Sequence, residues 1–118
     1  MSSYKELEIY KLAYGLANRV HKASLKLPAF ELYEQGSQIR RSTKGVRDTI
    51  VEGYGRRRYK AEFIRYLIYA QASCDEATNQ ASAIIDLYPK ITEFVDILNN
   101  LEVLGKKINN FIKYVEYD

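Results

Sequence analysis

The sequence predicts an all-α fold, an antiparallel up-down-up-down four-helix bundle built as one domain over residues 1–118. The chain has six glycines and two prolines, so long segments run without a helix breaker. Apolar residues recur at steps of three and four in four separate segments, and this spacing keeps one face of a helix apolar. The connections between the segments are short, so sequential helices are expected to be antiparallel neighbours.

The first helix is expected over about residues 4–26, where apolar or small residues recur from Tyr10 to Leu27. Pro28 ends it, because the proline ring disfavours the helical conformation at the residue before it. Residues 27–36 then form a connection, with a short turn at residues 30–33.

The second helix is expected to end at about residue 54 and to begin at Ser37, a candidate N-cap, or a few residues earlier. Its apolar stripe consists of Ile39, Thr43, Val46, Ile50 and Tyr54. Gly53 and Gly55 bracket its end, where a left-handed C-terminal cap often requires glycine.

The third helix, over about residues 59–88, has the most regular pattern, and Pro89 ends it. Its seam alternates steps of four and three, as in helical bundles, and consists of Phe63, Leu67, Ala70, Cys74, Ala77, Ala81, Ile84 and Tyr88. The small residues in the middle of this seam allow a neighbouring helix to approach closely. The fourth helix follows over about residues 91–115, with a seam of Ile91, Phe94, Leu98, Leu101, Gly105, Ile108, Ile112 and Val115.

Large apolar residues also lie outside these seams, namely Ile64, Ile68, Ile85, Leu87, Val95, Ile97, Val103, Leu104 and Phe111. Eleven tyrosines add amphipathic area. Large exposed apolar patches usually mark interfaces, so the pattern favours a homo-oligomer. The alternative is a wide core stripe on each helix.

Several classes of function are disfavoured. The single histidine, His21, and the single cysteine, Cys74, are too few for a zinc site built from such ligands. Cys74 falls on the apolar seam, where a thiol usually serves packing. The chain lacks an apolar stretch suited to a membrane span or a secretory signal. We therefore expect a cytoplasmic, non-enzymatic protein with no catalytic residues, metal, cofactor, small-molecule substrate or membrane partner.

The charge is unevenly distributed along the chain. The formal net charge is +3, yet residues 40–65 hold nine basic and only three acidic side chains. A positive patch on a near-neutral body attracts polyanions. The candidate nucleic-acid-binding residues in this patch are Arg40, Lys44, Arg47, Arg56, Arg57, Arg58 and Lys60.

These cations would neutralise phosphates, and interleaved tyrosines would stack on unpaired bases. The tyrosines are Tyr54, Tyr59, Tyr66 and Tyr69. The alternative is a solvated face with internal ion pairs, such as Lys44 with Asp48. On the other flank of the second helix, Arg41, Asp48 and Glu52 are expected to form a register-setting network with Glu76 of the third helix.

Three further segments form a recognisable set. The first is Gln38-Ile39-Arg40-Arg41 followed by Ile50-Val51-Glu52-Gly53-Tyr54-Gly55-Arg56-Arg57. The second is Ala72-Ser73-Cys74-Asp75-Glu76, and the third is Leu27-Pro28 with Glu31 and Tyr33. Together, over about residues 5–115, they resemble the four-helix proteins encoded in intervening sequences of bacterial 23S rRNA genes.

The resemblance implies an antiparallel four-helix bundle that assembles as a homopentamer. A related accessory protein of diversity-generating retroelements has the same bundle and ring, and it binds nucleic acid and a reverse transcriptase. The resemblance supplies neither a reaction nor established binding residues. We therefore expect a protein that binds RNA or DNA through its basic surface. The alternative is a scaffold that docks an acidic protein partner and has no nucleic-acid role.

Overall fold

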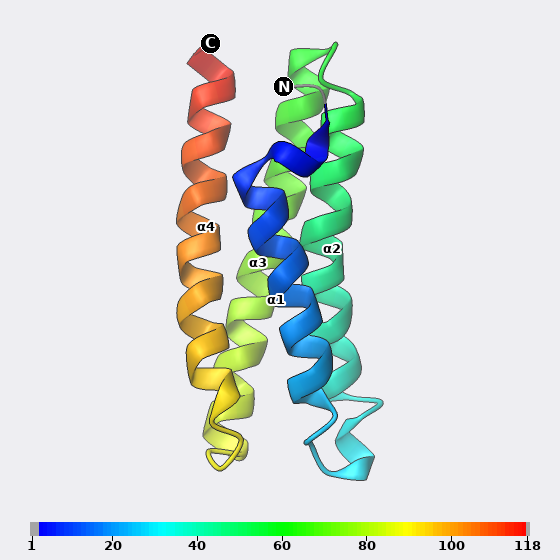
Figure 1. Ribbon diagram of the computed structural model, residues 1–118, viewed down its shortest axis with the longest axis vertical. Coiled ribbons are helices and arrows are strands. Elements are labelled where there is room, and N and C mark those ends of the chain that lie inside the picture. The colour runs from blue at the N-terminus through cyan, green and yellow to red at the C-terminus, as the bar shows by residue number, and fades with distance from the viewer. Residues whose placement is uncertain (1–2, 118) are drawn as a thin grey trace.

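The computed structural model describes residues 3–117, which form four long helices and two short 3-10 helices. The long helices are α1 (Glu8–Ser24), α2 (Gln35–Gly55), α3 (Lys60–Leu87) and α4 (Glu93–Tyr117). Figure 1 shows each helix running in the direction opposite to the one before it. The bundle measures 45 × 20 × 20 Å. Residues 3–117 include no strand. The all-α four-helix bundle predicted from the sequence is confirmed.

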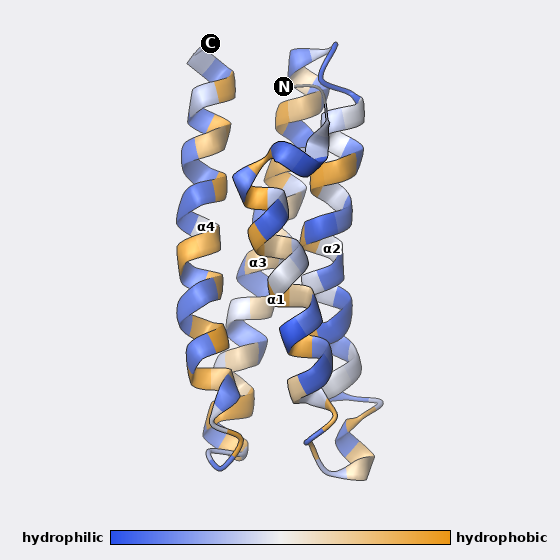
Figure 2. Ribbon diagram, viewed as in Figure 1, coloured by the Kyte–Doolittle hydropathy of each residue, from blue (hydrophilic) through white to orange (hydrophobic). Residues whose placement is uncertain are grey.

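Each helix packs against two others. α2 and α4 both contact α1 and α3, whereas α1 lies diagonally opposite α3, and α2 lies diagonally opposite α4. The space between the four helices holds the largest fully buried side chains, among them Phe94, Ile50 and Leu67. Figure 2 shows hydrophobic residues recurring along every helix with hydrophilic residues between them. Burial of these apolar side chains is the main stabilising contribution to the fold.

The predicted seam of α3 is confirmed for seven of its eight residues, Phe63 to Ile84, which are all buried, whereas Tyr88 follows the end of α3 and is half-buried. The buried stripe of α4 differs from the prediction, because Leu98 and Gly105 of the predicted seam are only half-buried. Ile97 and Leu104, which the pattern placed outside the seam, are each only 1% exposed. Four of the other apolar residues outside the seams remain 46–58% exposed, namely Ile68, Leu87, Val95 and Val103. None of the helices formed by the described residues is long and apolar enough to cross a membrane.

The start of the first helix differs from the prediction. α1 begins at Glu8, because Leu7 has an extended backbone with φ −68° and ψ 128°. The preceding 3-10 helix, η1 (Tyr4–Glu6), therefore lies at an angle to α1, as Figure 1 shows. Leu7 is 4% exposed and belongs to the hydrophobic core. The break in the helix thus coincides with a residue whose side chain is in the core.

The connection between α1 and α2 is held by a buried carboxylate. It contains the 3-10 helix η2 (Ala29–Glu31), slightly before the turn expected at residues 30–33. Glu31 is 5% exposed, and it accepts a hydrogen bond from the Tyr88 hydroxyl at 2.7 Å. This bond raises the pKa of Tyr88 above its ordinary value. α2 then begins at Gln35, slightly before Ser37.

The prediction that Gly53 and Gly55 form a left-handed cap is wrong. Both residues are helical, and no glycine among residues 3–117 has a positive φ. Gly53 is needed for space, because a Cβ atom there would lie 2.9 Å from Cβ of Tyr66. The glycine therefore allows α2 and α3 to approach closely just before the chain turns between them.

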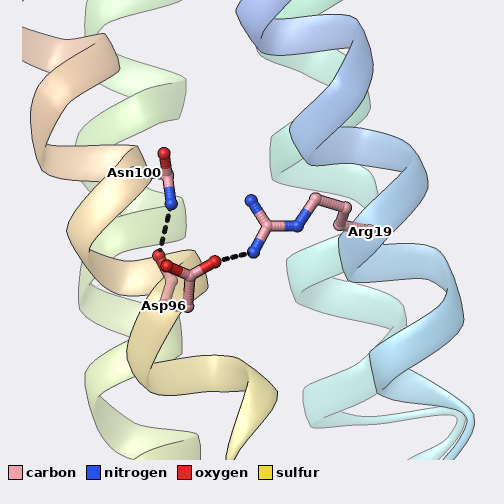
Figure 3. Close-up of polar contacts among 3 residues, drawn as sticks. All are labelled: Arg19, Asp96 and Asn100. Carbon is pink, nitrogen blue, oxygen red and sulfur yellow. Dashed lines mark hydrogen bonds and ion pairs between the residues drawn. The ribbon is translucent and has the colours of Figure 1, made fainter.

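The face between α1 and α4 is bridged by exposed ion pairs. Arg19 pairs with Asp96, whose backbone carbonyl also accepts a hydrogen bond from the Asn100 side chain at 2.8 Å (Figure 3). Lys26 pairs with Glu93, and this hydrogen bond lowers the pKa of Glu93 below its ordinary value. Exposed pairs contribute about 0–1 kcal/mol each, so they add little to the stability of the bundle.

Candidate nucleic-acid interface

The connection between α2 and α3 is a tight turn with three consecutive arginines. α2 ends at Gly55 and α3 begins at Lys60. The N–H of Tyr59 donates to the carbonyl oxygen of Arg56 at 2.9 Å, which closes the turn. Residues 56–60 are all exposed, and we call them the arginine turn. It lies at the end of the bundle where α1 begins and α4 ends (Figure 1).

All three of these arginines lie over tyrosine rings, Arg58 least closely, with its guanidinium carbon 5.9 Å from the ring centroid of Tyr59. The guanidinium carbon of Arg57 is 4.0 Å from the ring centroid of Tyr54, and Arg57 also donates to the backbone carbonyl of Tyr54 at 2.9 Å. The guanidinium carbon of Arg56 is 4.4 Å from the ring centroid of Tyr66. Arg56 donates to the backbone carbonyl of Glu52 at 3.1 Å. The cation–π contact and the hydrogen bond together restrain the guanidinium groups of Arg56 and Arg57 while the side chains stay exposed.

The first turns of α3 extend this surface. Tyr66 and Tyr69 contact edge to face, with ring centroids 5.5 Å apart. The guanidinium carbon of Arg65 lies 5.7 Å from the Tyr66 centroid and 5.9 Å from the Tyr69 centroid. Arg65 also forms an ion pair with Glu62 at 3.2 Å. Sequence reasoning left Arg65 out of the candidate set, although its spacing of four residues from Tyr69 places both on one helix face.

Arg40 is not part of this cluster. It lies near the other end of α2, sixteen residues before Arg56, which corresponds to about 24 Å along a helix. Its half-buried guanidinium donates to the Ser24 hydroxyl at 2.8 Å and to the Leu32 carbonyl at 2.6 Å. The structure therefore does not bring Arg40 together with the candidate residues of the arginine turn, and its side chain ties the α1–α2 connection to α2.

Arg47 and Lys44 also lie along α2, away from the arginine turn, and both are half-buried. Arg47 donates to Asp48 at 2.8 Å, and this bond raises the pKa of Arg47. Its guanidinium carbon is also 6.0 Å from the ring centroid of Tyr14. The internal pair expected between Lys44 and Asp48 is therefore replaced by one between Arg47 and Asp48. Of the seven predicted binding residues, the structure brings together Arg56, Arg57, Arg58 and Lys60.

Replacing Arg40 with alanine is expected to lower the free energy of unfolding by about 2–3 kcal/mol, because two charge-assisted hydrogen bonds are lost. Urea denaturation measures this change. The matched control is Arg41→Ala at the exposed neighbouring position, which should change stability by less than about 0.5 kcal/mol. Equal losses in both variants would contradict the structural role of Arg40.

Parts of two of the segments that carried the family resemblance, Gln38 with Arg41 and Ser73 with Glu76, line a polar hollow of about 590 Å³ between α2 and α3. Its lining residues are Gln38, Arg41, Ser42, Gly45, Ser73, Glu76 and Gln80. The Ser42 hydroxyl donates to the Gln80 side chain at 2.6 Å across it. The predicted network is not formed as expected, because Asp48 pairs with Arg47, and no ion pair of Arg41 or Glu76 occurs within residues 3–117.

The two residues considered for nucleophilic chemistry lie in different environments. Cys74 is 1% exposed in the core, where its thiol donates to the carbonyl oxygen of Leu101 at 3.4 Å. His21 lies exposed in the last turn of α1. Burial raises the pKa of Cys74 to about 12, so its reactive thiolate is scarce at neutral pH. Residues 3–117 contain no group of three or more His, Cys, Asp or Glu side chains placed to hold a metal ion.

Cys74 is accordingly expected to resist a thiol-specific disulfide reagent at neutral pH in the folded protein and to react at once in guanidinium. Its pKa also has a consequence for stability. The unfolded chain loses the thiol proton near its ordinary pKa of 9.0, whereas the folded protein keeps it until about 12. Cys74 therefore lowers the free energy of unfolding as pH rises through this window, and has no such effect at lower pH. Rapid modification of the folded protein would contradict this burial.

The fold and the site define a class of protein, an all-helical bundle that presents clustered arginines and tyrosines at one end. The chain matches the family of 23S rRNA-intervening sequence proteins over residues 5–110. It belongs to that family, which confirms the resemblance seen in the sequence. The comparison with curated proteins finds no match.

Proposed function

We propose that this protein is a non-enzymatic, cytoplasmic nucleic-acid-binding bundle that contacts RNA or DNA through the arginine turn. The observation that carries the proposal is that the cations of this turn are exposed and form no ion pairs with the described carboxylates. Arg56, Arg57, Arg58 and Lys60 are all exposed, and none of the carboxylates described in residues 3–117 forms an ion pair with them. Exposed cations without carboxylate partners are available to neutralise phosphates.

The fold supports this role by bringing the cations together. The turn places four positive side chains within five consecutive residues, and Arg56 and Arg57 are already restrained by tyrosine contacts and backbone hydrogen bonds. A restrained guanidinium loses less conformational entropy when it binds a phosphate. The N-terminus of α3 also begins at Lys60, and helix N-termini favour anions.

We further propose that the protein forms a homo-oligomer, and specifically the homopentamer that the family resemblance implies. The exposed apolar residues Ile68, Leu87, Val95 and Val103 support contact with other subunits. Rotational symmetry would repeat the arginine turn and increase avidity for a long polyanion. Light scattering is expected to give about five times the chain mass of 13.7 kDa. A monomer mass would contradict the oligomer.

The nucleic-acid proposal is tested by measuring the affinity for a short labelled RNA over a series of salt concentrations. Four phosphate contacts on a single strand predict a log–log slope of about −3. A flat response, or no binding at the lowest salt concentration, would refute the proposal. A pull-down with and without nuclease provides a second readout. A partner that stays bound after nuclease treatment would favour an acidic protein as the ligand.

A further inference from the structure

The candidate cations that lie together occupy only a short stretch of the chain, residues 56–60. Arg40 is engaged by Ser24 and Leu32, and Arg47 is engaged by Asp48. Of the seven candidate binding residues, the four that lie together, Arg56, Arg57, Arg58 and Lys60, are at the turn between two helices instead of along the exposed side of one helix. Proteins that read duplex DNA through an α-helix place it in the major groove, with several side chains along it reaching base edges. The arginine turn does not have that layout.

The same surface offers flat groups that suit unpaired bases. Tyr59 is 63% exposed and Tyr69 is 48% exposed, so part of each ring is open to solvent. Arg56 and Arg57 each have the guanidinium group over a tyrosine ring, and both side chains are exposed to a ligand. Unpaired bases stack on aromatic rings and on guanidinium planes, whereas bases within a duplex already stack on one another.

We propose that the arginine turn selects single-stranded over double-stranded nucleic acid, and that Tyr59 and Tyr69 stack on unpaired bases. This inference rests on the proposed nucleic-acid function and specifies its ligand. The cations of the turn contact phosphates of either form. The tyrosine rings contribute affinity only where bases are free to leave the stack.

The test compares a labelled single strand with a blunt duplex of the same sequence, as RNA and as DNA, by fluorescence anisotropy. The single strand is expected to bind at least about tenfold more tightly, because stacking on an aromatic side chain adds affinity base by base. The double variant Tyr59→Leu with Tyr69→Leu should lower single-strand affinity by about tenfold or more and leave duplex affinity unchanged. Its matched control is Tyr14→Leu with Tyr33→Leu, two exposed tyrosines away from the turn, which should change neither affinity.

Equal or tighter binding of the duplex by the wild-type protein would overturn this inference and leave the proposed function standing. An equal loss for both probes in the Tyr59 and Tyr69 variant would also overturn it. Binding of neither probe by the wild-type protein would refute the proposed function, and this inference with it. Circular dichroism of each variant checks that the bundle is folded.

Discussion

Neutralising the arginine turn with Arg56→Gln, Arg57→Gln and Arg58→Gln is expected to weaken binding of single-stranded RNA by about a hundredfold at about 0.1 M salt. Each phosphate contact on a single strand releases about 0.7 of a counterion, which is worth about fivefold in affinity at that salt concentration. Loss of three contacts should also make the log–log salt slope shallower by about 2. Fluorescence anisotropy over a salt series measures both quantities.

The control for this prediction is the pair Lys22→Gln and Lys90→Gln, which removes exposed positive charge from the last turn of α1 and from the connection between α3 and α4. Both segments lie at the end of the bundle opposite the arginine turn (Figure 1). If binding depends on the arginine turn itself, the control should weaken it by no more than about twofold, as expected for distant screened charges. A local site would be contradicted if each removed charge weakened binding equally in the arginine-turn variant and in the lysine control.

Replacing Phe94 with alanine is expected to lower the free energy of unfolding by about 3–5 kcal/mol, the usual cost of truncating a fully buried phenylalanine. Phe94 is 0% exposed and is the largest of the fully buried side chains. Truncation removes apolar contacts and leaves a cavity that the bundle fills only in part. Urea denaturation, with light scattering at the same protein concentration, measures the change.

The adjacent position provides the matched control. Val95 is 50% exposed on the same helix, so Val95→Ala should cost less than about 0.5 kcal/mol unless a second subunit covers it. A larger loss at Val95 that depends on protein concentration would support an oligomer interface there. Suppose instead that Phe94→Ala lowers the free energy of unfolding no more than Val95→Ala does, and that the Val95→Ala effect does not depend on protein concentration. That result would contradict the packing of the core.

Hydrophobic periodicity was sufficient to predict the bundle. The seam of α3 follows directly from the spacing of Phe63 to Ile84, because helix geometry alone places these residues on one face. The local exceptions depend on tertiary contacts that a single sequence does not reveal. The first helix is broken at the buried Leu7, and close packing against Tyr66 explains Gly53 without a left-handed backbone.

The candidate site was predictable in part. Composition located the basic window, and the run from Arg56 to Arg58 fell on a turn whose exposure follows from its position between helices. Charge alone could not show which cations have internal partners. Arg40 reaches the Ser24 hydroxyl and the Leu32 carbonyl only because the chain folds back between α1 and α2. Arg65 joins the site through its contacts with Tyr66 and Tyr69, which helix spacing makes visible once the helix is known.

Photo-crosslinking with thiouridine-substituted single-stranded RNA, followed by peptide mass mapping, tests most directly whether the arginine turn is the binding surface. Crosslinks are predicted within residues 56–69, with Tyr59 and Tyr69 as the main acceptors, and they should disappear when Arg56, Arg57 and Arg58 are neutralised. Crosslinks concentrated in the α1–α2 connection or on the face between α1 and α4 would contradict this account.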